Sequence, residues 1–204
     1  MTTAELVREL RDRTGAGMME CKKALDETSG NMEKAITYLR ERGLALAAKK
    51  TGRAVNEGRI HSYIHSNSKV GVMLEINCET DFVARTDDFM ALCNDIAMHI
   101  AAANPRYLDK EQVPAADVEK EKDIFRAQLA DSGKPAQVIE KILEGKIGKF
   151  YEETCLLQQK FVKDPDHTIE AIVKASIAKL GENINVRRFA RFQLGEGAKA
   201  EQAN

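Results

Sequence analysis

Apolar residues in the first fifty positions recur every three to four residues, the spacing of helices that are buried on one side. The glycines of RTGAG (13–17) permit a tight reversal after the first helix, and SGN (29–31) ends the second. A third helix begins at Met32 and continues through GLALAAKK (43–50). We therefore expect residues 1–50 to form a compact domain of three helices.

The stretch TGRAVNEG (51–58) is polar, unpatterned and bounded by glycine, and we interpret it as a linker. Beyond it, apolar residues alternate with other residues, which is the period of a β-strand. Two such runs flank NSK (67–69), a predicted turn, and indicate a β-hairpin with one apolar face. That face is expected to carry Ile60, Ser62, Ile64, Val70, Val72, Leu74, Ile76 and Cys78.

Two further helices and a third strand complete the predicted core. Asp87 is placed to cap the first of these helices, and Gly181 ends the second because glycine readily adopts a left-handed conformation. The apolar stripe of the first helix consists of Phe89, Leu92, Cys93, Ile96, Ala97 and Ile100, and that of the second of Ile169, Ile172, Val173, Ile177 and Leu180. The last strand (182–194) is expected to place on one face Ile184, Val186, Ala190, Phe192 and Leu194.

Residues 115–160 differ from the rest because they are heavily charged and carry few apolar positions. The stretch DSGKP (131–135) offers a glycine to end one helix and a proline to begin the next. Two helices that share a narrow apolar seam on either side of a turn are typical of an antiparallel helical hairpin. We expect this hairpin to project from the core.

These elements predict an α+β fold. A helical domain at 1–50 and a linker at 51–58 precede a core at 59–194, in which helices cover a three-stranded antiparallel sheet. The helical hairpin at about 115–160 belongs to this core. The polar stretch 195–204 is a predicted disordered tail.

The chain of 204 residues is long enough for one full core and a small extra domain. Charged residues make up 31% of it, and 31 basic and 32 acidic side chains give a net charge of −1. Direct binding of nucleic acid would call for a basic surplus, so a protein partner reached through mixed polar and apolar contacts fits better. The polar N-terminus is unlike a signal peptide, and no apolar run is long enough for a membrane span, which favours a cytoplasmic protein.

The sequence contains no glycine-rich phosphate loop, no G-x-S-x-G and no H-E-x-x-H motif. His61 and His65 are four residues apart, about 13 Å on a strand, which is too far to share a metal. The four cysteines lack the spacing of a zinc site and are interpreted as buried, reduced thiols: Cys21, Cys78, Cys93 and Cys155. We therefore expect no enzymatic activity, no metal and no cofactor, while a cysteine link between two subunits stays open.

Met18 and Met19 stand at the start of the second predicted helix. Neighbouring residues of a helix point about 100° apart, so both side chains cannot face the same small core. One methionine is expected in the core and the other on the surface, where it offers a soft and adaptable contact to a partner.

Phe82 lies in the stretch LEINCETDFVARTDD (74–88), at the point where the strand pattern stops. In one interpretation the ring closes an end of the core, and burial statistics for aromatic residues favour this alternative. In the other, Phe82 and its neighbour Asp81 lie in a surface loop before the next helix. An aromatic ring beside a carboxylate would there be available to a partner.

Four longer stretches follow one another along the chain: LVRELRDRTGAGMMECKKAL, EINCETDFVAR, SGKPAQVIEKILEGKIGKFYEE and KLGENINVRRFARF. In this order they resemble the elongation factor Ts family, and the likeness covers almost the whole chain. Members of that family are guanine-nucleotide exchange factors for the translation GTPase elongation factor Tu. The resemblance implies the same activity here, and it implies that the domain at 1–50 is ubiquitin-associated-like.

The resemblance also implies which residues touch the GTPase. The motif implicated in dislodging magnesium from the GTPase is Thr80, Asp81, Phe82 and Val83. Met18 and Met19 are similar to residues that touch the nucleotide domain of the GTPase. Two further sets resemble contact residues of the family: His65, on the phosphate-loop side, and the pair Leu180 and Gly181.

Longer members of the family have two core subdomains, each with a sheet, whereas this chain has enough strands for one. A single three-stranded sheet leaves an apolar face that needs cover. We therefore expect a symmetric homodimer whose sheets face each other. The alternative function is a scaffold without exchange activity, whose helical domain binds a ubiquitin-like or ribosomal partner while the core dimerises.

Overall fold

The computed structural model describes residues 3–129 and 135–197. The chain is divided into two compact units. Unit 1 comprises Met1–Ile60, Glu75–Cys93 and Ala171–Arg187, and unit 2 comprises His61–Leu74, Asn94–Glu170 and Arg188–Asn204. Three strands and two helices cross these boundaries, so each unit contains part of them. The division into domains at 1–50 and 59–194 stays a prediction.

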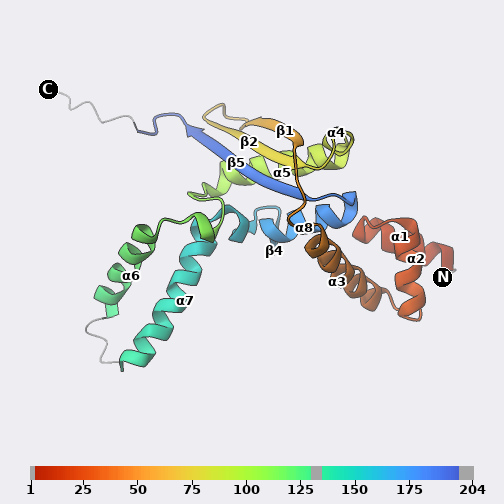
Figure 1. Ribbon diagram of the computed structural model, residues 1–204, viewed down its shortest axis with the longest axis horizontal. Helices are drawn as coiled ribbons and strands as arrows, with labels where there is room; N and C mark the ends of the chain where they lie inside the picture. Colours follow the sequence, from red (N-terminus) through yellow and green to blue (C-terminus); the bar gives the residue numbers. More distant parts are fainter. Residues whose placement is uncertain (1–2, 130–134, 198–204) are drawn as a thin grey trace. The chain divides into compact units, whose positions relative to one another are not determined.

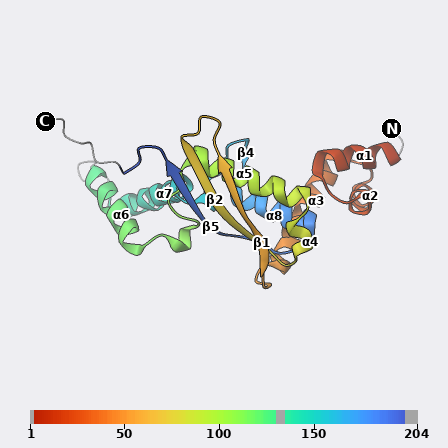
Figure 2. The same ribbon diagram turned by 90° about the horizontal axis from the view of Figure 1, so that it is seen from above.

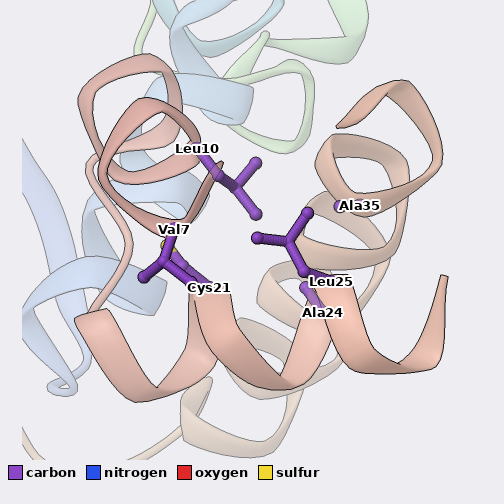
Figure 3. Packing of buried hydrophobic residues seen from close by; sticks show 6 residues of the cluster. All are labelled: Val7, Leu10, Cys21, Ala24, Leu25 and Ala35. Carbon is purple, nitrogen blue, oxygen red and sulfur yellow. The ribbon is translucent and has the colours of Figure 1, made fainter. Parts of the chain in front are cut away.

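Three helices form in the first fifty residues, as the sequence predicts. They are α1 (Thr3–Thr14), α2 (Met18–Glu27) and α3 (Met32–Lys50). Each of them contacts the other two. Figure 3 shows the small core that they enclose, which consists of Val7, Leu10, Cys21, Ala24, Leu25 and Ala35.

Glycine and asparagine residues form the turns between these helices. Gly15 and Gly30 have φ angles of 67° and 76°, in the left-handed region that favours glycine. The side chain of Asn31 accepts a hydrogen bond of 2.9 Å from the backbone N–H of Lys34 and caps α3. The third helix then runs to Lys50, as predicted.

The main sheet has three strands in the order β1–β2–β5, so β2 lies in the centre. β1 (Glu57–Ile64) and β2 (Val70–Cys78) form the predicted hairpin, and β5 (Ile184–Gln193) is the predicted last strand. β1 begins inside the stretch interpreted as a linker. In unit 1, α8 (Ile169–Leu180) and the first half of α5 (Asp87–Ala103) lie on one side of the strands (Figure 2).

Burial confirms the predicted inward face of the central strand but not that of β1. The buried side chains of β2 are Val72, Leu74, Ile76 and Cys78. In β1, Ile60 and Ile64 are exposed, whereas His61 and Tyr63 are half-buried, so the predicted apolar face of this strand is wrong. Both faces of β1 carry large side chains, and alternation alone does not tell which face turns inward.

β5 also departs from its predicted alternation. Ile184 and Val186 are buried as expected, but Phe192 and Leu194, placed on the same face, are exposed. The burial pattern shifts by one residue at 187–188, where two consecutive side chains are exposed. An extra residue in a strand produces such a shift, and here it leaves the apolar end of β5 on the exposed side.

The apolar stripes predicted for α5 and α8 turn inward. All six stripe residues of α5 are buried, as are three in α8, namely Ile169, Val173 and Ile177. The predicted cap of α5 is wrong, because Oγ1 of Thr86 rather than Asp87 accepts the backbone N–H of Phe89, at 3.2 Å. Threonine and aspartate are both good caps, so the sequence does not decide between two neighbours.

Unit 2 contains the predicted helical hairpin. α6 (Ala115–Leu129) and α7 (Ala136–Thr154) lie side by side (Figure 1). Pro135 occupies the cap position of α7, and the rest of the predicted turn DSGKP lies outside the described residues. The hairpin ends at Thr154 rather than near 160, since a short 3₁₀ helix, η3 (Leu156–Gln158), follows.

Unit 2 also has elements that the sequence does not predict. A 3₁₀ helix, η1 (Lys110–Gln112), precedes α6. β3 (Lys160–Phe161) and β4 (Asp164–Thr168) pair antiparallel as a separate two-stranded sheet. The predicted disordered tail begins with a turn at 195–197, and its remainder lies outside the described residues.

Candidate partner-binding site

Phe82 lies on a one-turn helix that directly follows the central strand. β2 ends at Cys78, and α4 comprises Asp81–Ala84. The side chain of Phe82 is 80% exposed. The interpretation in which this ring closes the core is therefore wrong, and the predicted surface loop is a short helix. The helix holds the ring on the surface of unit 1.

The local sequence explains why a helix forms here. Thr80 has an extended backbone, with φ −129° and ψ 154°, and its Oγ1 accepts a hydrogen bond of 3.4 Å from the backbone N–H of Val83. A threonine in this position is a good helix cap. Asp81 pairs with Arg85 at 2.8 Å, across one turn of the helix. We call residues 80–83 the Phe82 turn.

A carboxylate from the far end of the sequence holds the beginning of this turn. Oε2 of Glu182 accepts hydrogen bonds from the backbone N–H groups of Glu79, at 3.1 Å, and Thr80, at 3.0 Å. Oε1 of Glu182 accepts a third hydrogen bond, of 2.6 Å, from the hydroxyl of Thr80. Hydrogen bonds to an ionised carboxylate are stronger than neutral ones, so Glu182 fixes the direction in which β2 passes into α4.

The connection is reciprocal. Oε1 of Glu79 accepts a hydrogen bond of 2.7 Å from the backbone N–H of Asn183, and Nδ2 of Asn183 donates to the carbonyl oxygen of Arg53 at 2.8 Å. The hydrogen bond from Asn183 lowers the pKa of Glu79, and the positive charge of Arg53, 3.6 Å away, lowers it further. We call Glu79, Thr80, Glu182 and Asn183 the carboxylate clasp.

The clasp brings the end of α8 next to the Phe82 turn. Gly181 ends that helix with a φ of 74°, as predicted for a glycine cap. Lys50, the last residue of α3, donates a hydrogen bond to the carbonyl oxygen of Gly181. Leu180 is half-buried. Two of the predicted contact groups, the Phe82 turn and the pair Leu180 and Gly181, are thus brought together by the fold.

Lys179 connects this region with the turn that precedes the methionine pair. Its Nζ pairs with Oδ1 of Asp88 at 2.7 Å. Its side chain also passes so close to Gly15 that a Cβ at that glycine would lie 3.6 Å from Cε of Lys179. The turn between α1 and α2 therefore packs against the end of α8.

Met18 and Met19 are both exposed, at 50% and 73%. The prediction that one of them enters the core is wrong, because Cys21, Ala24 and Leu25 supply the buried face of α2. The two methionines instead line a surface groove together with the first half of α1. Flexible apolar side chains in such a groove are suited to contact with a partner.

His65 lies at the turn of the β1–β2 hairpin, in unit 2, and is exposed. Its Nδ1 shares a hydrogen bond of 3.1 Å with the hydroxyl of Tyr63, and the two ring centroids are 6.2 Å apart. A neighbouring side chain on the same strand thus orients this histidine on the surface.

The buried thiols and the buried histidine have perturbed pKa values. All four cysteines are free and buried. Burial raises the pKa of Cys78 to about 11 and that of Cys93 to about 12, so both are thiols at neutral pH. Burial lowers the pKa of His99, whose Nε2 is hydrogen-bonded to Oε1 of Gln159 at 2.9 Å.

The described residues hold neither a cluster of metal ligands nor a membrane-spanning helix. Among residues 3–129 and 135–197, no group of three or more His, Cys, Asp and Glu side chains could hold a metal ion. No helix in the described part of the chain is long and apolar enough to cross a membrane.

Sequence reasoning missed the residues beneath the surface. Glu182 and Thr80 are 102 positions apart, and no local pattern connects them. One signal is present, because Glu182 directly follows the glycine that ends α8 and so lies outside the helix. In that position its carboxylate can accept hydrogen bonds from backbone N–H groups elsewhere in the chain, but the sequence does not show which N–H groups these are.

Exposed apolar side chains on an anchored backbone are typical of a protein that binds another protein. A sequence profile of the family described as "Elongation factor TS" matches residues 9–196. The elongation factor Ts of Fervidobacterium nodosum is 62% identical over 194 residues, which are 95% of this chain and 98% of that protein. The elongation factor Ts of Heliobacterium modesticaldum is 58% identical over 202 residues, 99% of this chain and 94% of that protein. The chain belongs to the elongation factor Ts family and is thus a translation elongation factor.

Proposed function

We propose that this protein is a guanine-nucleotide exchange factor for elongation factor Tu. Its membership of the elongation factor Ts family supports this function. The observation that carries it is the 80% exposure of Phe82 on a turn whose backbone is hydrogen-bonded to Glu182. A ring that already points outward enters a partner without first leaving a core. Leu180 and Gly181, held beside it, extend the same contact surface.

An exchange factor binds the nucleotide-free GTPase more tightly than the GDP-bound form. The GTPase holds GDP through backbone N–H groups around the phosphates and a magnesium ion, which demands near-octahedral oxygen ligands. The ring of Phe82 enters between side chains of the GTPase and displaces the element that supports the magnesium site. Asp81 adds a charge at the same place. The exchange factor itself makes and breaks no covalent bond.

The energy available from this contact is of the required size. Burial of one phenylalanine side chain is worth about 1.5–3 kcal/mol, and each tenfold change in affinity needs about 1.4 kcal/mol. Phe82 therefore accounts for about one to two powers of ten in GDP affinity. Contacts by Met18, Met19 and His65 add to this effect. By linkage, returning nucleotide loosens the exchange factor by the same factor.

The variant Phe82→Ala tests the proposal. We expect it to fold normally, because the ring is mostly exposed, and to release fluorescent GDP from elongation factor Tu about 10–100-fold more slowly. Stopped-flow fluorescence measures the rate. The matched control is Val162→Ala, which removes an exposed apolar side chain in unit 2. Equal rates for Phe82→Ala and the unchanged protein would exclude this role and favour the scaffold without exchange activity.

We also propose a symmetric homodimer that forms through the sheet. The exposed apolar residues of the sheet in unit 2 form what we call the open sheet face, which consists of Ile64, Met73, Phe192 and Leu194. A Cβ at Gly71 would lie 3.0 Å from Cδ1 of Ile64, so the isoleucine covers that glycine on this face. A second copy of the chain would bury these side chains. Light scattering is expected to give twice the mass of one chain.

Two finer assignments complete the proposal. The domain of α1, α2 and α3 is ubiquitin-associated-like and adds the groove of Met18 and Met19 to the contact with the GTPase. Its three helices around a core of valine, leucine, alanine and cysteine support this assignment. The protein works in the cytoplasm beside its GTPase, without direct contact with nucleic acid.

A further inference from the structure

We propose that Glu182 is a positioning residue for nucleotide exchange, which fixes the Phe82 turn in the direction that insertion into the GTPase requires. This inference rests on the proposed function, because it concerns how the same ring is presented. The side chain of Glu182 accepts two hydrogen bonds from Thr80, at the start of the Phe82 turn, and a third from Glu79 directly before it. It thereby acts through Thr80 and not by touching the nucleotide.

The hydroxyl of Thr80 shows how the effect is transmitted. A hydroxyl has one proton to donate and two lone pairs to accept with. The hydroxyl of Thr80 donates a hydrogen bond of 2.6 Å to Oε1 of Glu182. Its oxygen accepts a hydrogen bond of 3.4 Å from the backbone N–H of Val83. The carboxylate therefore turns the hydroxyl so that its lone pairs face α4. Glu182 sets the cap of this helix as well as the backbone before it.

The orientation of Phe82 depends on that backbone. Because 80% of its side chain is exposed, packing within the chain contributes little to the direction of the ring. The ring follows Thr80 by two residues, so a change in φ or ψ at Thr80 changes the direction in which the ring points. A ring that samples several directions would meet its site on the GTPase less often.

The clasp also couples the two parts of the contact surface. The backbone N–H of Asn183 is bound by Glu79, and the carbonyl oxygen of Gly181 is bound by Lys50. These hydrogen bonds lie on both sides of Glu182. The end of α8 and the Phe82 turn are therefore presented to the GTPase as one surface.

The main test replaces Glu182 with residues that keep or lose its hydrogen bonds. We expect Glu182→Ala to slow GDP release from elongation factor Tu about tenfold, the lower end of the effect of losing the ring of Phe82 itself. Glu182→Gln should recover most of the rate, because its amide oxygen accepts both backbone N–H groups while its NH₂ donates to the hydroxyl of Thr80. Glu182→Asp keeps the charge but is one methylene shorter, and should be slow. The matched control is Glu144→Ala, an exposed glutamate on α7.

A double variant separates positioning from general stability. If Glu182 acts through the ring, then Glu182→Ala should slow release less than about twofold in a chain that already carries Phe82→Ala. Amide hydrogen exchange at Glu79 and Thr80 should be faster in Glu182→Ala. A merely structural role would instead lower the melting temperature and slow release equally in both backgrounds, and that result would overturn the inference.

The outcomes also distinguish this inference from the proposed function. If Phe82→Ala slows GDP release and Glu182→Ala does not, the positioning role is wrong and the exchange function stands. If the unchanged protein does not speed GDP release above the rate of elongation factor Tu alone, the exchange function itself is wrong. Should Glu182→Ala fail to fold, Thr80→Val removes the same hydroxyl bond, and Thr80→Ser, which keeps the hydroxyl, should be the faster of the two. Equal rates for these two variants would overturn the inference.

Discussion

Two exposed apolar surfaces of this protein are built in different ways. The Phe82 turn in unit 1 presents one aromatic ring, and Glu182 holds the start of this turn with hydrogen bonds to two backbone N–H groups and one hydroxyl. The open sheet face in unit 2 spreads four apolar side chains over three strands and the residue that follows β5. A single ring held in one direction suits insertion into a partner, whereas a flat apolar face gains most by burying area against a similar face.

The difference teaches that exposure alone does not assign a role. Met18 and Met19 are also exposed, but a methionine side chain has several rotatable bonds and adapts to its partner. The function of the Phe82 turn should depend on the direction and shape of one ring. That of the open sheet face should depend on the total apolar area and on the absence of charge.

The largest effect is expected from charges on the open sheet face. Met73→Glu combined with Phe192→Glu would bring like charges together across a two-fold axis, which costs several kcal/mol. We expect the dimer to dissociate at least about 100-fold more readily. Sedimentation equilibrium measures this. The control Gln193→Glu adds a charge at an exposed neighbouring position on the same strand. A double variant that still dimerises like the control would break the comparison.

An intermediate effect is expected from a change in the shape of the ring. Phe82→Leu keeps an apolar side chain but loses the planar ring, and we expect GDP release to be about threefold slower than in the unchanged protein, because most of the buried apolar area remains. Its dimer mass should not change. Stopped-flow release of fluorescent GDP ranks it against Phe82→Ala. If the leucine variant is as slow as the alanine variant, shape rather than buried area drives the exchange.

The sequence predicts those elements whose two faces differ clearly. α5 has an apolar stripe opposite a polar face, and β2 has aliphatic residues on one face, so burial follows the pattern in both. β1 carries isoleucine on one face and histidine and tyrosine on the other, and β5 shifts its alternation at 187–188. Which face of such a strand is buried depends on its neighbours in the sheet, and the sequence of a single strand does not reveal them.

The candidate site shows the same limit. Phe82 stands out because a strand pattern stops beside it, but its exposure depends on Thr80 and on Glu182, which is about one hundred residues away. Hydrogen bonds over such a separation leave no periodic signal. A turn held by a distant carboxylate is therefore visible only in the folded chain.

Acid should affect unit 1 and unit 2 in different pH ranges. Burial lowers the pKa of His99, in unit 2, below its ordinary value of 6.5. As the pH falls, this histidine is protonated at a higher pH in the unfolded chain than in the folded chain. Its contribution to the free energy of unfolding is therefore complete above about pH 6.5 and decreases as the pH drops below that value. The hydrogen bond from Asn183 lowers the pKa of Glu79 below 4.5. Its stabilisation is present above about pH 4.5 and is lost as the pH falls further.

Urea unfolding at about pH 7.5 and about pH 5.5 measures the first of these effects. We expect His99→Gln, which does not titrate, to reduce the loss of stability between these two pH values. The protection of the Asn183 amide from exchange should be the same at both pH values, because Glu79, which accepts its N–H, is still ionised. An unchanged loss in His99→Gln would mean that another group titrates, and lower protection of the Asn183 amide at the lower pH would mean that the clasp fails together with the histidine.

The smallest effect is expected at the ion pair between Asp81, in the Phe82 turn, and Arg85. Arg85 and Asp81 pair at 2.8 Å, but their side chains are 77% and 44% exposed, and such pairs contribute little because water screens them. We expect Arg85→Ala to change the free energy of unfolding by less than about 0.5 kcal/mol. Amide exchange at Thr80 should not change, in contrast to Glu182→Ala, because the arginine binds neither the strand end nor the hydroxyl. If Arg85→Ala speeds that exchange as much as Glu182→Ala does, the turn is held by surface charge rather than by the carboxylate beneath it.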